Sequence, residues 1–363
     1  MCKNVLMKKI AFITHSFHEI TKSANVYIDA IFRDKEKYKI DIFYNDEWGE
    51  KSRYKKFDEK IENYDAVIIL QLISFNLLKK INCKNIIFIP MYDYSRNHTI
   101  EKWLPAAEVK ILSPVQAMSN ELKLIGLNPY QFKYFPSVAD YKKPNFEKVY
   151  FWNRVEKLNC KTVLTLLKNY NFSNLNIHTA HDPGNKPIMP SKRQVKNFNI
   201  SFTEWFNSKE DYLKHLSSYG IYIAPRPFEG GAAAFIDAMK AGCVVIAPNH
   251  PPYNEYIENN INGFLYEFTN PKPIPFNQFN LELISKSAYE SIKIGSENFN
   301  SNLENIHNYI FNEDLEINSS SYFENLEAVF EKTWFKFGNL TKKDKLIELS
   351  KLILSKFKKY IKF

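Results

Sequence analysis

Two carboxylates near a pair of glycines are the residues of this 363-residue chain whose types and spacing best suit chemistry. Glu229 directly precedes Gly230 and Gly231, and Asp237 stands eight positions after Glu229. Because glycine has no side chain, the backbone at such a pair can approach a ligand closely. An ionised carboxylate can accept hydrogen bonds from two neighbouring hydroxyl groups of a sugar or a ribose. The pattern therefore favours a ligand that is rich in hydroxyl groups.

A strand, a glycine turn and a helix are predicted to position these residues. The apolar run 221–224 indicates a buried strand, and 232–240 is predicted to be a helix that begins just after the glycines. A second apolar run, 243–247, predicts the next strand of a parallel sheet. Free backbone N–H groups and the positive end of the helix dipole would meet at the turn, which suits a diphosphate. A diphosphate joined to hydroxyl-rich groups is a sugar nucleotide.

The same stretch resembles the donor-binding signature of the retaining GT-B glycosyltransferases of the group 1, or family 4, type. The matching positions are Glu229-Gly230, Asp237, Ala238-Met239, Gly242, Val245-Ile246-Ala247, Glu255 and Asn262-Gly263. One position departs from the signature, because its second acid is usually Glu and here is Asp. The resemblance implies an α/β fold of the GT-B class. In that fold two Rossmann-like doubly wound domains face a cleft, and C-terminal helices cross back to the N-terminal domain.

The resemblance also implies a role for each candidate residue. Glu229, a candidate catalytic residue, would hold hydroxyl groups of the donor sugar, and Asp237 would hold the ribose diol. Trp205 and Phe206 follow a predicted strand where the family binds the nucleobase. The residues implied to bind the donor diphosphate are Arg154, Lys157, Gly230, Gly231 and Ala232. An arginine suits a phosphate because its planar fork makes paired hydrogen bonds, and a lysine acts as a point charge.

Some positions of the family pattern differ in this chain. Asn153 stands where the family has Gly, and the spacing from Arg154 to Lys157 is short. Tyr92-Asp93 ends a predicted strand where the family often has His-Asp, so Asp93 is the acceptor-side candidate catalytic residue. The alternatives on this side of the site are His15, His18 and His98.

Alternating strands and helices along the chain predict doubly wound, mostly parallel sheets. We expect a Rossmann-like acceptor domain at 1–147 and a nucleotide-sugar-binding domain at 148–315. A crossover helix at 316–340 and a basic amphipathic tail at 341–363 would follow. The polar, proline-containing stretch 141–148 is predicted to be the linker between the domains.

The charge is concentrated at the C-terminus. The net charge is +9, and 341–363 contribute eight lysines and two acids, or +6, so that the rest of the chain carries +3. A nucleic-acid-binding protein more often carries its basic residues on the folded body, so nucleic acid is not an expected partner. A basic amphipathic helix suits the surface of an anionic membrane. Packing of this helix on the N-terminal domain is the alternative.

Cysteines and apolar runs indicate the compartment. The four cysteines are scattered without a CxxC pair, which is typical of a reducing cytosol, and no apolar run has the length of a signal peptide or a membrane span. We expect a cytoplasmic protein that contacts the inner face of the membrane peripherally. The chain contains no Asp-x-Asp, so no bound metal is expected, and no cofactor apart from the donor.

The predicted activity is that of a hexosyltransferase-type glycosyltransferase. It would move a sugar from a nucleoside-diphosphate donor to a carbohydrate or lipid-linked acceptor, with retention, in the synthesis of bacterial surface polysaccharide. A sugar-nucleotide epimerase is an alternative, but it would need a set of acids and bases around the donor sugar. The other alternative is a non-catalytic, membrane-associated scaffold with the GT-B fold, which turnover of any donor would exclude.

Overall fold

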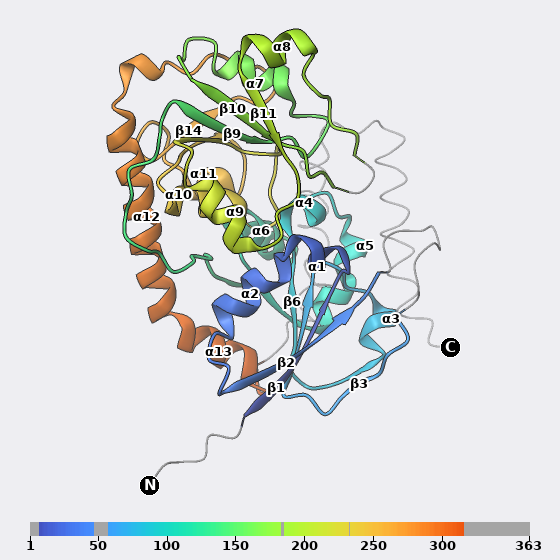
Figure 1. Cartoon of the computed structure of the whole chain (residues 1–363). Coiled ribbons are helices and arrows are strands. Elements are labelled where there is room, and N and C mark those ends of the chain that lie inside the picture. Colours follow the sequence, from blue (N-terminus) through green and yellow to red (C-terminus); the bar gives the residue numbers. More distant parts are fainter. Residues whose placement is uncertain (1–6, 47–56, 183–184, 232, 316–363) are drawn as a thin grey trace. The chain divides into compact units, whose positions relative to one another are not determined.

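The computed structural model describes residues 7–46, 57–182, 185–231 and 233–315 (Figure 1). The predicted crossover helix at 316–340 and the predicted tail at 341–363 lie outside these residues. The chain divides into two compact units. Of the described residues, unit 1 contains those up to Phe132 and those from Asn302 onward, and unit 2 contains those from Lys133 to Ser301.

Unit 1 contains a six-stranded parallel sheet with the strand order β2-β1-β4-β6-β7-β8. Its strands are β1 (Lys8–Thr14), β2 (Tyr38–Tyr44), β4 (Ala66–Leu70), β6 (Ile86–Ile89), β7 (Lys110–Ser113) and β8 (Tyr130–Gln131). All five residues of β4 are buried, as the apolar run in the sequence predicts for a central strand of a parallel sheet. Two short strands, β3 (Ile61–Glu62) and β5 (Ile81–Asn82), pair separately.

The helices of unit 1 are mostly short. They are α1 (Phe17–Thr21), α2 (Ser23–Ile31), α3 (Phe75–Leu78), α4 (Tyr92–Ser95), α5 (Ile100–Trp103), the 3₁₀ helix η1 (Leu104–Glu108), α6 (Gln116–Leu124) and α13 (Leu303–Phe311). The last of these belongs to unit 1 although it follows unit 2 in the sequence. The chain therefore crosses back to its N-terminal unit, as the GT-B prediction requires.

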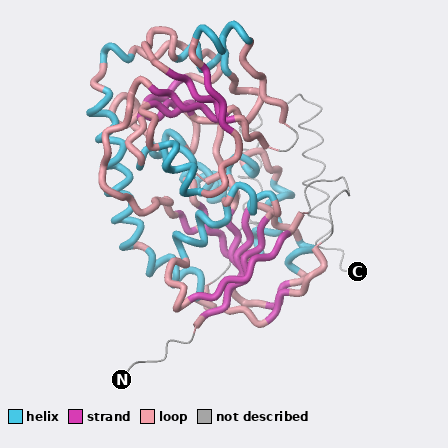
Figure 2. The backbone as a smooth tube through the Cα atoms, viewed as in Figure 1, coloured by secondary structure: helices cyan, strands magenta, loops and turns pink. Residues whose placement is uncertain are grey.

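Unit 2 contains a second six-stranded parallel sheet, with the order β11-β10-β9-β12-β13-β14 (Figure 2). Its strands are β9 (Lys148–Trp152), β10 (Asn174–His178), β11 (Ile200–Thr203), β12 (Ile221–Ile223), β13 (Val244–Pro248) and β14 (Phe264–Tyr266). The predicted strand at 221–224 is confirmed as β12, and the one at 243–247 as β13. Both strands are buried throughout.

Helices connect these parallel strands, and two further helices of unit 2 follow β14. The helices of unit 2 are α7 (Cys160–Leu166), α8 (Lys192–Asn197), α9 (Lys209–Leu216), α10 (Ala233–Lys240), α11 (Tyr253–Tyr256), the 3₁₀ helix η2 (Phe276–Gln278) and α12 (Leu281–Ser301). Ser208 caps α9, because its side chain accepts a hydrogen bond of 3.0 Å from the Asp211 N–H. Five consecutive residues of α10 are buried, from Phe235 to Met239, so this helix is held firmly beside the sheet.

The boundary between the units differs from the predicted one. The prediction divided the domains after residue 147 and again after 315, whereas the compact units divide after Phe132 and after Ser301. Residues 133–147 belong to unit 2 because they pack along α12. Lys143 pairs with Glu282 at 2.6 Å, and Tyr289 donates a hydrogen bond of 2.9 Å to the Ala139 carbonyl. The stretch 141–148 is polar because one side faces solvent, but it does not act as a free linker.

Candidate functional site

The strand order of unit 2 marks one place for a ligand. Strands β9 and β12 are hydrogen-bonded neighbours, although β10 and β11 lie between them in the sequence. The crossovers reverse direction at this point, and ligands of doubly wound sheets bind beyond the carboxyl ends of the strands that flank such a switch. Arg154 follows β9 and Arg226 follows β12. Asp182 follows β10 at the same edge of the sheet.

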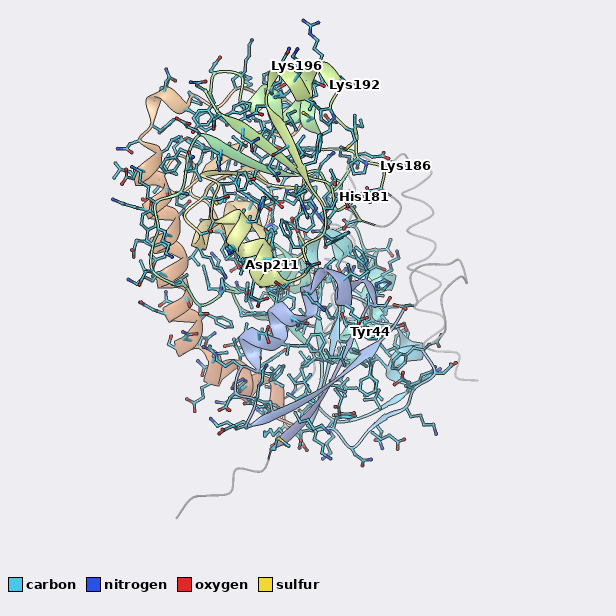
Figure 3. The ribbon with its side chains drawn as sticks, viewed as in Figure 1. Tyr44, His181, Lys186, Lys192, Lys196 and Asp211 are labelled. Carbon is cyan, nitrogen blue, oxygen red and sulfur yellow. The ribbon has the colours of Figure 1, made fainter. Side chains whose placement is uncertain are left out.

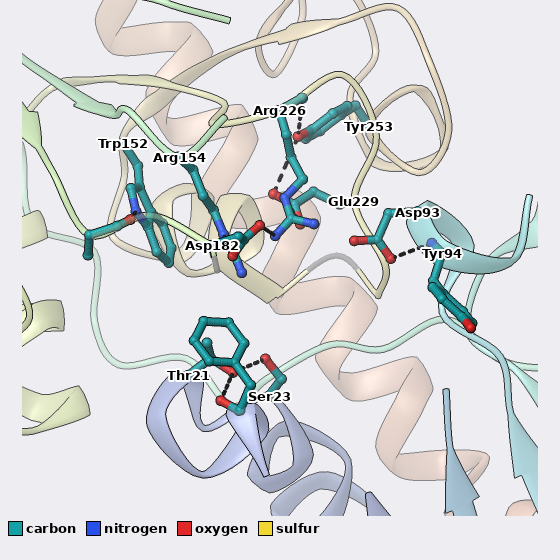
Figure 4. A network of polar contacts seen from close by, with 12 residues as sticks. Thr21, Ser23, Asp93, Tyr94, Trp152, Arg154, Asp182, Arg226, Glu229 and Tyr253 are labelled. Atoms are coloured by element: carbon teal, nitrogen blue, oxygen red, sulfur yellow. Dashed lines mark hydrogen bonds and ion pairs between the residues drawn. The ribbon is translucent and has the colours of Figure 1, made fainter. Parts of the chain in front are cut away.

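These three side chains form an ion-pair network (Figure 4). The Nε atom of Arg154 lies 2.7 Å from Oδ1 of Asp182, and Nη2 of Arg226 lies 2.9 Å from Oδ2 of the same carboxylate. Trp152 lies beneath the Arg154 guanidinium, 4.5 Å from its ring centre to the guanidinium carbon. The side chains of Arg154, Arg226 and Asp182 are 11%, 13% and 20% exposed, respectively. Solvent therefore screens these charges only in part.

Glu229 extends the network. One of its carboxylate oxygens lies 3.8 Å from Nε of Arg226, and the other lies 3.5 Å from the Tyr253 hydroxyl. Tyr253 is fully buried, and this burial raises the pKa of its phenol well above the usual value. The phenol therefore stays protonated and donates a hydrogen bond of 2.9 Å to the Arg226 carbonyl. Glu229 is only 7% exposed, so its carboxylate has a fixed position within unit 2.

The turn that carries Glu229 is held by its neighbours. The ring of Phe228 stacks on His250 with the ring centres 4.5 Å apart and the planes within 5°. His250 also lies 3.2 Å from the Pro227 carbonyl through Nδ1. The backbone of Gly230 and Gly231 is buried and leads toward α10. Ala232, the third predicted diphosphate contact of this turn, lies outside the described residues.

Asp237 lies on α10 and is 4% exposed. Its carboxylate is 3.1 Å from Nζ of Lys240 and 3.7 Å from Nζ of Lys209. Lys240 is one turn further along α10, and Lys209 opens α9. The predicted ribose contact thus stands between two lysines, and a diol that binds it would share the carboxylate with them.

The structure does not place Lys157 with the other predicted diphosphate residues. Lys157 lies in the turn after β9 with an exposed side chain, and no contact between it and Arg154, Asp182 or Glu229 is among the interactions of the described chain. Asn153, at the family's glycine position, is buried, and its amide group donates 3.2 Å to the Ile188 carbonyl. The second cation beside Arg154 is Arg226.

The two predicted nucleobase residues differ in their surroundings. Trp205 is 44% exposed and meets the edges of Trp152 and His178, with ring centres 6.2 and 6.3 Å apart. Phe206 is half-buried and stacks on His178 with a ring distance of 5.3 Å. Trp205 therefore presents a free apolar surface, whereas Phe206 contributes mainly to packing.

His178, at the carboxyl end of β10, is a neutral member of this aromatic cluster. Burial lowers the pKa of His178 to about 4, and the positive charges of His215 and Arg154 add to the effect. Thr203 donates 2.9 Å to the side chain of Asn176, so its hydroxyl oxygen can accept from Nδ1 of His178, 3.2 Å away. The second ring nitrogen, Nε2, is then an acceptor at the edge of the site.

The predicted N-terminal residues lie in unit 1. Asp93 stands in the first turn of α4, where one of its oxygens accepts a hydrogen bond of 2.9 Å from the Tyr94 N–H. His18 pairs with Thr14 at 2.6 Å, and His15 lies 3.6 Å from Asp46. His98 packs its ring against Trp103. The contacts of these three histidines lie within unit 1, and a role on the acceptor side stays a prediction.

Asp182, Arg226 and Tyr253 are members of the network that the sequence analysis missed. Asp182 is 28 positions from Arg154 and 44 from Arg226 in the sequence, so no local motif joins them. One signal was present for Arg226, because it follows the predicted strand at 221–224. Charged residues at the carboxyl ends of parallel strands meet at the same edge.

No helix of the described chain has both the length and the apolar character to cross a membrane.

Comparison with known proteins gives a family match over part of the chain. Residues 190–274 match the sequence model of the family described as Glycosyl transferases group 1. The matched part contains Glu229, Asp237 and Trp205, whereas Arg154 and Asp93 precede it. A search of curated proteins found no match.

Solved structures resemble the chain over a longer range. The lipopolysaccharide outer core galactosyltransferase WaaB matches with a TM-score of 0.53 and 15% identity, over 84% of this chain and 99% of that one. HepE of Anabaena, solved with UDP and glucose, gives 0.55 and 12%, over 83% and 99%. TarM gives 0.50 and 14% over 68% of this chain, and the match spans about half (55%) of TarM. At these identities the likeness shows the fold: the chain has the GT-B fold of two Rossmann-like domains, and its residues 190–274 match the group 1 glycosyl transferases.

Proposed function

We propose that the chain is a glycosyltransferase that moves a hexose from a nucleoside-diphosphate donor to a carbohydrate or lipid-linked saccharide acceptor. The observation that carries the proposal is the meeting of Arg154, Arg226 and Glu229 at the switch point of the unit 2 sheet. Cations for a diphosphate and a buried carboxylate for sugar hydroxyls stand there side by side. The family match of residues 190–274 supports the same class of reaction.

In this proposal the departing diphosphate is the group that the chain stabilises. Arg154 and the N–H groups of Gly230, Gly231 and Ala232 would bind it, with Lys157 as the further cation that the family pattern implies. Fixed positive groups lower the barrier because negative charge develops on the leaving group. Glu229 would hold hydroxyls of the donor sugar and Asp237 those of the ribose, and Trp205 would cover the base. Transition states of glycosyl transfer resemble an oxocarbenium ion, so that positioning supplies much of the rate.

Further parts of the proposal come from the family resemblance and from the composition. The reaction would retain the anomeric configuration without a bound metal, and Asp93 of unit 1 would act on the acceptor side. The product would be a bacterial surface glycan, made in the cytoplasm. Residues 341–363 would hold the protein on an anionic membrane, and vesicle binding that survived deletion of these residues would contradict this contact.

The donor can be identified by thermal unfolding with nucleoside diphosphates and their sugars, starting with UDP and UDP-glucose. HepE is solved with UDP and glucose, which makes uridine donors the first choice. A ligand that binds only the native state raises the unfolding temperature by mass action. We expect one nucleoside diphosphate to stabilise the protein and its sugar form to stabilise it further. In Glu229→Ala the additional stabilisation by the sugar should disappear, because the carboxylate that accepts the sugar hydroxyls is gone.

Glu297→Ala is the matched control, because it removes an exposed carboxylate from α12 in the same unit. It should respond to both ligands like the unchanged protein. Transfer of the sugar from the identified donor to saccharide acceptors then tests the reaction itself. The absence of a response to every nucleotide, with and without divalent metal, would overturn the proposal and favour a non-catalytic scaffold.

A further inference from the structure

The carboxylate of Asp182 occupies the position between two arginines at the switch point of unit 2 (Figure 4). One oxygen is 2.7 Å from Arg154 and the other is 2.9 Å from Arg226. A single carboxylate thus bridges two guanidinium groups that come from the ends of different strands. A phosphate group has the same geometry toward arginine, since both anions present oxygens that accept paired N–H donors.

Arg154 has hydrogen-bond donors that its ion pair with Asp182 does not use and that a larger anion could engage. A guanidinium has five N–H donors, and the Arg154–Asp182 pair uses Nε. Among the described residues, none accepts a hydrogen bond from the two Nη atoms of Arg154. The Trp152 ring beneath the guanidinium and the partial burial of the side chain fix its orientation. The Arg154 guanidinium is therefore positioned to bind either the Asp182 carboxylate or a phosphate ligand.

Charge decides whether both anions can be present together. Arg154 and Arg226 contribute two positive charges, and Asp182 and Glu229 contribute two negative charges, so these four side chains together carry no net charge. A diphosphate that entered beside both carboxylates would meet their repulsion at short range and in partly buried surroundings. Glu229 is held by Tyr253 and Arg226 inside the turn after β12. Asp182 lies in the loop after β10 and is the more exposed of the two acids.

We infer that Arg154 and Arg226 form an anion site for a phosphate or diphosphate group, and that Asp182 is its resident occupant. A diphosphate binds by displacing the Asp182 carboxylate, and Arg226 rather than Lys157 is the second cation of the site. Arg226 also contacts Glu229, the carboxylate proposed to bind the sugar. When the diphosphate replaces Asp182 beside Arg226, it therefore changes the surroundings of an arginine that positions Glu229. The inference rests on the proposed function and names the residues of its diphosphate site.

The test measures the affinity of inorganic pyrophosphate, and of the nucleoside diphosphate found above, by titration calorimetry on the full chain. Asp182→Asn keeps the size of the side chain and removes its charge. We expect it to bind pyrophosphate about tenfold more tightly than the unchanged protein, because the competing anion is gone. Arg154→Gln and Arg226→Gln should each weaken binding by about tenfold or more. Arg226→Lys replaces Arg226→Gln if the latter does not fold, and it should still weaken binding because it loses the paired donors.

Lys192→Gln removes an exposed cation of α8 in the same unit and is the control; it should bind pyrophosphate within about twofold of the unchanged protein (Figure 3). Lys157→Gln compares the cation that the family pattern implies with Arg226. We expect it to weaken binding less than Arg226→Gln does, because the Lys157 side chain is exposed to solvent. A tenfold loss in Lys157→Gln with none in Arg226→Gln would overturn the assignment of the second cation.

A second measurement tests whether the Asp182 carboxylate occupies the anion site or only stabilises the structure around it. In Asp182→Gly, free acetate can enter the vacated position, so at constant ionic strength it should weaken the binding of pyrophosphate to this variant and leave the unchanged protein unaffected. Weaker pyrophosphate binding by Asp182→Asn, or no effect of acetate on Asp182→Gly, would overturn the displacement. If Arg154→Gln and Arg226→Gln bind the nucleotide as tightly as the unchanged protein does, this inference is overturned and the proposed function is not. If neither the unchanged protein nor Asp182→Asn binds pyrophosphate or any nucleotide, the proposed function fails as well.

Discussion

His178 shows how strongly the surroundings of one residue can set its charge. It is 2% exposed at the carboxyl end of β10, and its ring stacks against Tyr150 and Phe206. A protonated imidazole in this position would be desolvated and would lie near Arg154, which is why its pKa falls to about 4. The neutral ring is therefore part of the site across the whole physiological pH range.

This pKa predicts a dependence of stability on pH. The unfolded chain binds a proton at His178 below about pH 6.5, whereas the folded chain does so only near pH 4, so stability falls as the pH decreases through this window. From pH 7.5 to 5.5 the loss due to this residue should be about 1.3 kcal/mol. His178→Gln should lack this part of the loss in urea unfolding. His181→Gln, which changes an exposed histidine three positions away, is the control (Figure 3). Equal pH dependence in the two variants would contradict the prediction.

The sequence predicts some residues of the candidate site and misses others for a physical reason. Glu229 and Asp237 belong to a local motif whose spacing is visible in the chain, and Arg154 follows a clear strand. Asp182 and Arg226 belong to no such motif. Asp182 pairs with Arg154 and Arg226 because the order of the strands in the sheet brings the three residues together. Strand order depends on packing of whole elements, and one sequence does not reveal it. The role of each of these residues in binding a donor stays a prediction.

At the scale of elements, helix α12 carries a close contact that the sequence does not suggest. A Cβ atom at Gly295 would overlap the ring of Phe135, which also packs against Tyr256. Phe135 comes from the stretch that precedes β9, so this contact explains why residues 133–147 follow α12. The helical stretch that begins at Leu281 is interrupted at Asn302, between α12 and α13. The change of unit falls at this interruption.

Gly295→Ala should destabilise the protein by about 1–3 kcal/mol, because the cost of overpacking exceeds the gain of about 1 kcal/mol in helix propensity. In a Phe135→Leu background the smaller side chain leaves room, so the same change should be neutral or stabilising. Urea unfolding of the four proteins gives the coupling free energy. Glu297→Ala, on the exposed side of α12, should change the stability by no more than about 0.5 kcal/mol. Equal effects of Gly295→Ala in both backgrounds would show that Phe135 is not the obstacle.

The strands were more predictable than these contacts. Runs such as 66–70 and 244–248 are apolar throughout because parallel strands are covered on both faces. The close approach of Gly295 to Phe135 joins positions 160 apart. Such contacts arise from packing density in the folded chain, which leaves no periodic trace in the sequence.

At the scale of the whole molecule, the chain returns to unit 1 through α13. A buried lysine holds the C-terminal end of this helix against the sheet of unit 1. The ammonium of Lys110, in β7, donates to the Asn85 side chain at 2.9 Å and to the carbonyls of Tyr309 and Ile310 at 3.1 Å each. It also reaches the Asn312 carbonyl. The last carbonyls of a helix have no partner within the helix, and Lys110 satisfies two of those of α13, at Tyr309 and Ile310. Burial lowers the pKa of this lysine.

Lys110→Met should destabilise unit 1 by about 2–4 kcal/mol, because the buried carbonyls at the end of α13 lose their common donor. Hydrogen exchange should rise first in residues 303–311. Lys37→Met removes an exposed lysine that pairs with Asp34 at 2.9 Å, and it should cost no more than about 0.5 kcal/mol. A loss in Lys110→Met as small as in this control would show that the buried contacts contribute little.

The division of the chain has a consequence for how such a protein can change during evolution. Unit 2 is one continuous stretch inserted between the two parts of unit 1, and the chain passes between the units only after Phe132 and after Ser301. A gene segment for 133–301 could therefore be exchanged as a cassette with two junctions, and β9 to β14 would move with all their neighbours. If unit 2 selects the donor, an exchange at both junctions could give an existing acceptor specificity a new sugar.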